Sequence, residues 1–153
     1  MKPLLHNLAL RLGGCRGVLV DSNVLLDIAT GDPNWAPWSS QALAECAEFT
    51  TLLINPIIYA EVSIGFQTIE ALDAALPGRL FERAPLPWEA GFLAGKCFLS
   101  YRRRGGEKSF PLPDFYIGAH AAIEKLSILT RDASRYRTYF PNLEVLAPAN
   151  DSL

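Results

Sequence analysis

Short apolar segments alternate with segments of helical periodicity along most of this chain, and this alternation restricts the fold more than any other feature. Strands are predicted at residues 18–20, 51–54, 80–83, 127–130 and 143–146. Helices are predicted between them, at 36–49, 55–66, 68–76, 87–104 and 114–125, with a short one after Asp21. Strands that alternate with helices are typical of βαβ units. The sequence therefore predicts an α/β fold with a mainly parallel sheet.

The length of 153 residues is that of one domain. We expect residues 1–16 to form a short extension, either a helix or a disordered tail, and residues 17–153 to form the single domain. The net charge of -2 excludes a protein that attracts nucleic acid through an overall basic field. Any contact with phosphate must therefore come from a local basic patch.

Cysteine usage and hydropathy bear on the compartment. The three cysteines are far apart and form no CxxC pair, so neither a zinc site nor a disulfide framework is indicated. This usage fits a reducing, cytoplasmic setting. The first residues make a poor signal peptide, and no apolar run reaches 18 residues, so we expect no membrane span.

Two acidic residues follow predicted strands. Asp21 comes directly after residues 18–20, and Asp132 follows residues 128–130 after one residue. Ligands of open α/β sheets bind beyond the carboxyl ends of the strands. Right-handed crossovers bring consecutive parallel strands together, so both acids are expected at the same edge.

Two further acids lie near predicted helix starts at that edge. Asp114 opens a helix after Pro113, and Glu61 lies one to two turns into the helix that Asn55 and Pro56 begin. Glu61 has apolar neighbours, and a buried glutamate without a partner is costly. Four carboxylates from distant segments could therefore meet.

Carboxylates gathered without cations repel one another, so such a cluster binds metal or traps a proton. Oxygen ligands select hard cations such as Mg²⁺ or Mn²⁺, and magnesium recruits phosphate groups of substrates. The alternative is that each acid merely caps a helix by accepting backbone N–H groups. The remaining acids, Asp27 among them, have no such placement and are expected at the surface.

Four segments resemble, in order, the motifs of the PIN-domain family: VLVDSNVLLD at 18–27, NPIIYAEV at 55–62, PDFYIGAHA at 113–121 and ILTRD at 128–132. The candidate acids Asp21, Glu61, Asp114 and Asp132 are separated by 40, 53 and 18 residues. The extension at 1–16 and the bulky pair Phe115–Tyr116 depart from the family pattern, but neither removes a candidate ligand.

The resemblance implies a PIN-like three-layer α/β/α sandwich with a central, mainly parallel five-stranded sheet. It implies a Mg²⁺- or Mn²⁺-dependent endoribonuclease similar to the VapC toxins of type II toxin–antitoxin pairs, with RNA as substrate, a cognate antitoxin as partner and a homodimeric assembly. Asp21, Glu61 and Asp114 correspond to metal ligands. Asp132 completes the pocket, either through indirect contacts or at a second ion.

Other polar residues have two interpretations each. Asn23 could bond a ligating carboxylate or a phosphate, or serve as a local cap. Arg131 and the run Arg102, Arg103 and Arg104 could hold RNA phosphates, or be solvated cations at helix ends. His120 lies roughly 240° around its helix from Asp114, so we expect it to be structural.

Three alternatives to the toxin remain open. The first is a stand-alone nuclease, and the second is a degenerate PIN fold that only binds RNA. The third is another magnesium-dependent enzyme that handles phosphate. A haloacid-dehalogenase-like phosphatase needs an aspartate where Asn23 stands, and a phospho-receiver needs a lysine where Ala147 and Pro148 follow the last strand.

Overall fold

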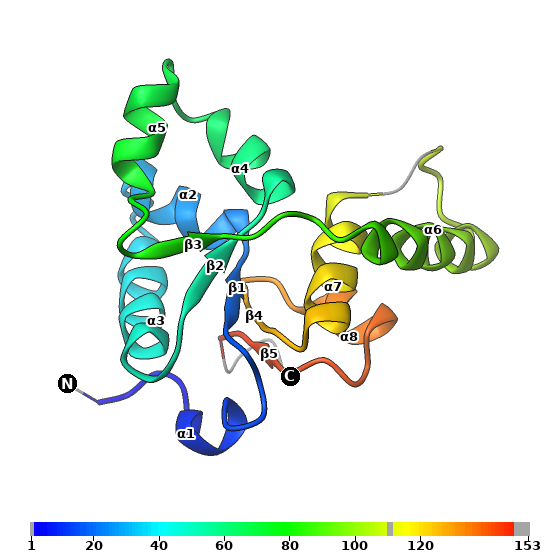
Figure 1. Ribbon diagram of the computed structural model, residues 1–153, viewed down its shortest axis with the longest axis horizontal. Helices are drawn as coiled ribbons and strands as arrows, with labels where there is room; N and C mark the ends of the chain where they lie inside the picture. The colour runs from blue at the N-terminus through cyan, green and yellow to red at the C-terminus, as the bar shows by residue number, and fades with distance from the viewer. Residues whose placement is uncertain (1, 110–111, 149–153) are drawn as a thin grey trace.

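The computed structural model describes residues 2–109 and 112–148. Five strands form one sheet in the order β3-β2-β1-β4-β5, and every neighbouring pair is parallel (Figure 1). The strands are β1 Val18–Val20, β2 Leu52–Ile54, β3 Phe81–Arg83, β4 Ser127–Leu129 and β5 Val145–Leu146. The predicted α/β fold with a parallel sheet is confirmed.

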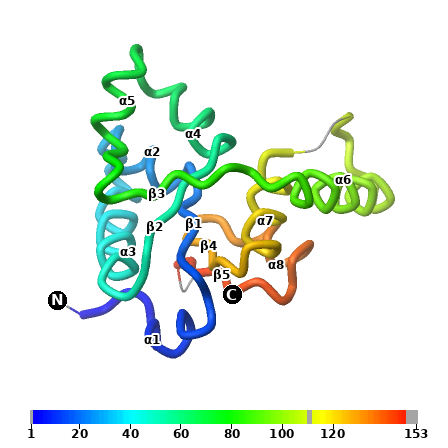
Figure 2. The backbone as a smooth tube through the Cα atoms, viewed as in Figure 1, coloured from blue at the N-terminus to red at the C-terminus, as the bar shows by residue number. Residues whose placement is uncertain are grey.

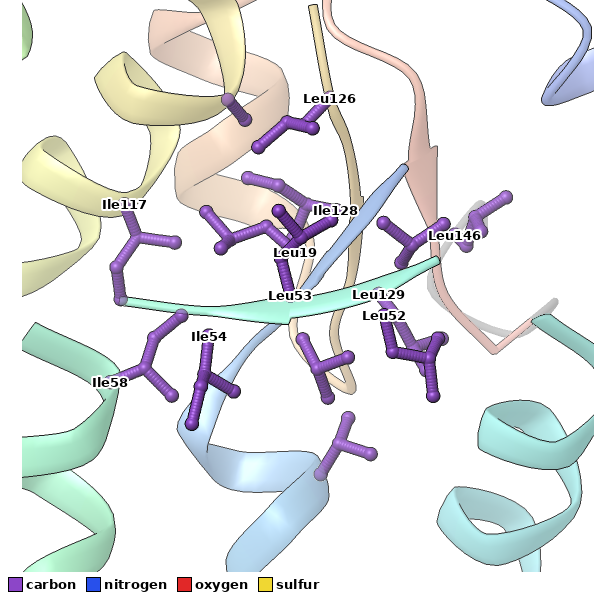
Figure 3. Packing of buried hydrophobic residues seen from close by; sticks show 14 of the residues in the cluster. Leu19, Leu52, Leu53, Ile54, Ile58, Ile117, Leu126, Ile128, Leu129 and Leu146 are labelled. Carbon is purple, nitrogen blue, oxygen red and sulfur yellow. The ribbon is translucent and has the colours of Figure 1, made fainter. Parts of the chain in front are cut away.

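The central strands are apolar at every position but Ser127, because both faces of the sheet are covered. All residues of β1, β2 and β4 are buried. Strands covered on both faces lose the alternation of polar and apolar residues, and only a continuous apolar run remains. Figure 3 shows the resulting core, in which Leu19 and Ile128 from the strands lie near Ile117 and Leu126.

Helices cover the two faces of the sheet. They are α1 Leu8–Arg11, α2 Ser22–Thr30, α3 Ala36–Phe49, α4 Pro56–Ser63, α5 Ile69–Ala75, α6 Trp88–Arg103, α7 Pro113–Glu124 and α8 Ser134–Tyr139. Figures 1 and 2 show α2, α3 and α5 on one side of the strands and α7 and α8 on the other. The long helix α6 packs against α7. No helix in the described ranges is long and apolar enough to span a membrane.

Several helix starts follow from the sequence. Asn55 caps α4 by accepting the N–H of Ile58, and Pro56 occupies the first turn, where a missing N–H does no harm. Helix α4 ends at Ser63, three residues earlier than predicted. Helix α8 was not predicted at all. The predicted loop at 105–113 lies partly outside the described residues, at positions 110 and 111.

The N-terminal segment packs against the domain. Leu5, Leu8 and Leu12 are buried in the main core. The carboxylate of Glu45 accepts the N–H groups of Leu4 and Leu5. These contacts anchor the short helix α1 beside α3.

Candidate active site

Asp21 is the most buried of the four candidate acids, with 3% of its surface exposed. It ends β1 and begins α2, and its Oδ1 accepts the N–H of Ser22 at 2.8 Å. Its Oδ2 accepts the hydroxyls of Thr130 and Tyr136, each at 2.9 Å. Capping therefore accounts for one carboxylate oxygen, while the other oxygen belongs to a separate polar network.

Asp114 lies in the first turn of α7 but does not cap it, because Leu112 occupies the cap position and makes no side-chain cap bond. Its Oδ1 lies 3.5 Å from the hydroxyl of Tyr136, and its Oδ2 lies 3.4 Å from Arg135. Tyr136 is fully buried. Since a hydroxyl has one proton, it donates to Asp21 or to Asp114 at any moment. The two carboxylates therefore share one tyrosine.

Glu61 and Asp132 adjoin this pair without joining it. Glu61 is half-buried on α4, and its Oε1 accepts the hydroxyl of Ser22 at 3.0 Å. Asp132 is exposed, and its Oδ1 accepts the hydroxyl of Ser134 at 3.1 Å, while its N–H bonds the hydroxyl of Thr130. The structure thus brings all four acids to the carboxyl edge of the sheet.

Burial and mutual repulsion raise the pKa values of three of these acids. Burial and the charge of Asp114 raise the pKa of Asp21 to about 6. Burial also raises the pKa of Asp114, against the lowering effect of Arg135. The pKa of Glu61 is raised by burial and by Asp114. Arg135, which pairs with Asp114, therefore does not offset the negative charge of these acids.

The donor set suits a hard divalent cation, because every candidate ligand is a carboxylate oxygen. Within residues 2–109 and 112–148, no three acidic, histidine or cysteine side chains are grouped closely enough to enclose an ion. The pair Asp21 and Asp114, held by Tyr136, is where an ion would fit. Glu61 or Asp132 would have to turn toward it to complete the coordination.

Asn23 joins α2 to the turn that follows β4. Its Nδ2 donates to the hydroxyl of Thr130 at 3.1 Å, and its Oδ1 accepts the N–H of Arg131 at 3.2 Å. The cap of α2 is Asp21, so Asn23 does not serve as the local cap. Asn23 therefore holds Thr130, whose hydroxyl donates to Asp21.

The prediction that Asp27 lies at the surface is wrong. Asp27 is buried, with 3% exposure, and it forms a two-bond ion pair with Arg131. Its contacts with Ser39 and Arg131 show that it faces inward from α2, which the sequence pattern alone did not reveal. The guanidinium of Arg131 is thereby engaged with Asp27.

The other basic candidates lie elsewhere. Arg102, Arg103 and Arg104 are exposed at the end of α6, and the guanidinium of Arg104 lies over the ring of Tyr139. His120 is buried, and its Nδ1 lies 3.0 Å from the amide nitrogen of Asn55. His120 makes this contact away from the four acids, as expected of a structural residue.

Sequence reasoning missed Tyr136. The residue lies in the unpredicted helix α8, and an aromatic side chain at this position is typical of the hydrophobic core. Its local sequence carried no signal, because its partners Asp21 and Asp114 lie 115 and 22 residues away along the chain. Its hydroxyl, unlike a phenylalanine ring, needs a partner when buried.

Comparison with known proteins decides the family. The family model of the PIN domain matches residues 18–141. The chain belongs to the PIN domain family. No curated protein sequence matches it.

Solved structures share this PIN fold. A VapBC2 complex from Rickettsia felis, bound to a fragment of promoter DNA, is 18% identical with a TM-score of 0.66, over 85% of this chain and 97% of that chain. VapBC-1 from nontypeable Haemophilus influenzae is 17% identical with a TM-score of 0.64, over 85% and 96%. FitAcB from Neisseria gonorrhoeae is 20% identical with a TM-score of 0.56, over 84% and 96%. At these identities the likeness concerns the fold.

Proposed function

We propose that this PIN domain is a metal-dependent endoribonuclease and the toxin of a type II toxin–antitoxin pair. The observation that carries the proposal is the contact of Asp21 and Asp114 with one tyrosine hydroxyl at the carboxyl edge of the sheet. A buried acid beside a half-buried one, both with raised pKa values, has no structural advantage, since an apolar pair would pack without repulsion. A cation that neutralises both acids explains the arrangement.

Asp21 and Asp114 would hold a Mg²⁺ or Mn²⁺ ion, with Glu61 and Asp132 completing the acidic pocket. Such an ion lowers the pKa of bound water and offsets charge on a phosphodiester under attack. The protein's own part is orientation: Ser22 and Thr130 donate to carboxylates and hold them in place. Tyr136 contacts both Asp21 and Asp114.

RNA would approach over Arg135, which lies beside the acids, and over Arg104 at the end of α6. Arg135 is partly exposed beside Asp114, and its guanidinium lies 6.0 Å from the centre of the Phe115 ring. Arg104 lies over Tyr139, whose ring packs on Phe115. A cation next to the acids can hold a phosphate beside the scissile bond, and one at the end of α6 can hold a phosphate further along the RNA. We assign these two contacts to Arg135 and Arg104.

The first test is the metal dependence of RNA cleavage. Purified protein should cut a structured RNA such as a tRNA with Mg²⁺ or Mn²⁺, and cutting should stop with EDTA. Activity should return when the metal is restored in excess. Undiminished cutting in EDTA would exclude the mechanism, whereas no cutting with either metal would favour a PIN fold that only binds RNA.

The antitoxin partner is proposed from the fold neighbours, which are toxin–antitoxin complexes from Rickettsia felis and Haemophilus influenzae. An inhibitor of this site must neutralise the charge of Asp21 and Asp114, so we expect it to present a basic segment to them. Complementary charge steers and registers such interfaces. A co-crystal structure with the product of the neighbouring gene should show an arginine or lysine at these acids. A complex whose acidic pocket is empty would contradict this expectation.

A further inference from the structure

Arg131 lies between two residues of the candidate site, Thr130 and Asp132, yet its side chain contacts neither. The guanidinium turns to α2, where Nε and Nη2 donate to the two carboxylate oxygens of Asp27 at 2.8 and 3.0 Å. This two-bond geometry is the strongest that an arginine makes with a carboxylate. The side chain of Asp27 is 4% exposed and that of Arg131 is 31% exposed.

Residues of α3 and the residue before it contact the two members of the ion pair. Ser39 of α3 is fully buried, and its hydroxyl donates to Asp27 Oδ2 at 2.9 Å. The guanidinium carbon of Arg131 lies 5.3 Å from the centre of the Trp35 ring. Asp27 and Trp35 therefore contact Arg131 directly, whereas the hydroxyl of Ser39 bonds only Asp27.

Asn23 lies one helical turn before Asp27 and faces the same turn of chain. Its amide bonds the hydroxyl of Thr130 and the backbone N–H of Arg131. Helix α2 therefore holds residues 130 and 131 at three points: a side-chain hydroxyl, a backbone N–H and a guanidinium. We name Asp27, Arg131 and the Asn23 amide the α2 clamp.

The clamp acts on the acids through Thr130. The hydroxyl of Thr130 donates to Oδ2 of Asp21, and the hydroxyl oxygen of Thr130 accepts the N–H of Asp132. A shift of Arg131 would therefore move a partner of Asp21 and the backbone of Asp132 together. Shifts of about 1 Å in supporting residues are enough to lower rates by about a hundredfold.

We propose that the Asp27–Arg131 ion pair is a positioning device for Thr130 and Asp132, and that Arg131 does not contact RNA. This inference rests on the proposed nuclease function. Two of the five N–H donors of Arg131 point at Asp27, and moving them to a phosphate would leave a buried carboxylate unpaired. This cost favours positioning over phosphate binding as the role of the side chain.

The test compares four variants with the parent: Arg131→Gln, Asp27→Asn, the double variant and the control Ser39→Ala. Steady-state cleavage is measured in Mg²⁺ at several salt concentrations, at least 10 °C below the lowest Tm. Arg131→Gln and Asp27→Asn should each lower kcat about ten- to a hundredfold, as loss of an outer-shell partner does. The double variant should be no worse than the worse single variant, because both break one interaction.

The KM for RNA and its dependence on salt should stay as in the parent. Ser39→Ala removes a hydrogen bond of Asp27 but leaves the ion pair, so its kcat should stay within about twofold. This control separates loss of the clamp from general loosening around Asp27. The proposal is overturned if Arg131→Gln alone raises KM and lowers the salt slope by about 0.7, the value for one lost contact with single-stranded phosphate. It is also overturned if both variants lower Tm while kcat is unchanged.

Hydrogen exchange of the metal-free proteins tests the α2 clamp independently of RNA cleavage. Amides of residues 131–134 should exchange at least about tenfold faster in Arg131→Gln and Asp27→Asn than in the parent, with β1 unchanged. If the parent cuts no RNA, the proposed function fails, and this measurement still decides whether the clamp orders the turn. Equal exchange in parent and variants would overturn the clamp itself.

Discussion

Replacing Asp21 with asparagine is expected to abolish RNA cleavage while making the metal-free protein more stable. The ligand that would contribute most buried charge is lost, and metal catalysis supplies several kcal/mol of transition-state stabilisation. Since about 1.4 kcal/mol is a tenfold change in rate, cleavage should fall by about 10²–10³-fold or more. Single-turnover cleavage of the same tRNA by parent and variant measures this loss.

The gain in stability follows from the pKa of Asp21, which is raised from 3.8 to about 6. Such a rise means that the ionised, folded protein is destabilised by about 3 kcal/mol relative to the protonated one. Asparagine removes that charge but accepts less well from Thr130 and Tyr136, so we expect a net gain of about 1–2 kcal/mol. Thermal melting in EDTA near pH 7.5 should show a Tm about 2–8 °C higher.

The pH dependence has a definite sign. Because the folded pKa of Asp21 is the higher one, the folded state retains a proton that the unfolded state loses. The contribution of Asp21 to metal-free stability is therefore complete below about pH 4 and is lost as the pH rises through about 6. The Tm difference between Asp21→Asn and the parent should grow over this range.

Two controls accompany this variant. Mg²⁺ should raise the Tm of the parent, because it binds only the folded site, and should raise that of Asp21→Asn much less. Glu107→Gln removes an exposed acid from the loop after α6 and should leave cleavage and Mg²⁺ stabilisation unchanged. An active Asp21→Asn protein with normal Mg²⁺ stabilisation would mean that Asp21 is only a helix cap.

Replacing Tyr136 with phenylalanine should have the second-largest effect. The hydroxyl donates to a buried carboxylate, and a hydrogen bond to a charged group contributes about 1.5–3 kcal/mol. We expect the metal-free protein to lose about that much stability near pH 7.5. Cleavage should fall about ten- to a hundredfold, because Asp21 and Asp114 lose their shared partner.

Tyr139→Phe is the matched control for Tyr136→Phe. Tyr139 lies in the same short helix, and its ring contributes packing against Phe115 and beneath Arg104. The control should keep at least about half of the parent activity and the parent Tm. Equal losses in both variants would indicate that α8 is merely sensitive to substitution. Full activity in Tyr136→Phe would show that the hydroxyl does not support cleavage.

Sequence reasoning predicted the strands and the carboxyl edge well because both depend on local signals. The apolar runs ending at Val20, Ile54 and Leu129 mark strands buried on two faces, and their ends mark where ligands collect. The short helix α8 carries no such signal. Its six residues contain two aromatic and two basic side chains, and its position depends on burial of Tyr136 between distant segments.

Asp27 shows a second limit of sequence reasoning. An aspartate inside an amphipathic helix is expected to face solvent unless a partner is known. Its partner Arg131 lies 104 residues further along the chain, so only tertiary packing brings the two together. For the same reason, the sequence indicated Arg131 as a candidate phosphate contact and gave no sign of its ion pair with buried Asp27.

Diffraction from crystals soaked in Mn²⁺ tests the central claim most directly. Anomalous scattering locates the ion without reference to activity or RNA. We predict one peak or two adjacent peaks within about 2.0–2.6 Å of carboxylate oxygens of Asp21 and Asp114, absent in Asp21→Asn crystals. Full Mn²⁺ occupancy at another site, with no peak between Asp21 and Asp114, would contradict the assignment of these acids as the metal centre.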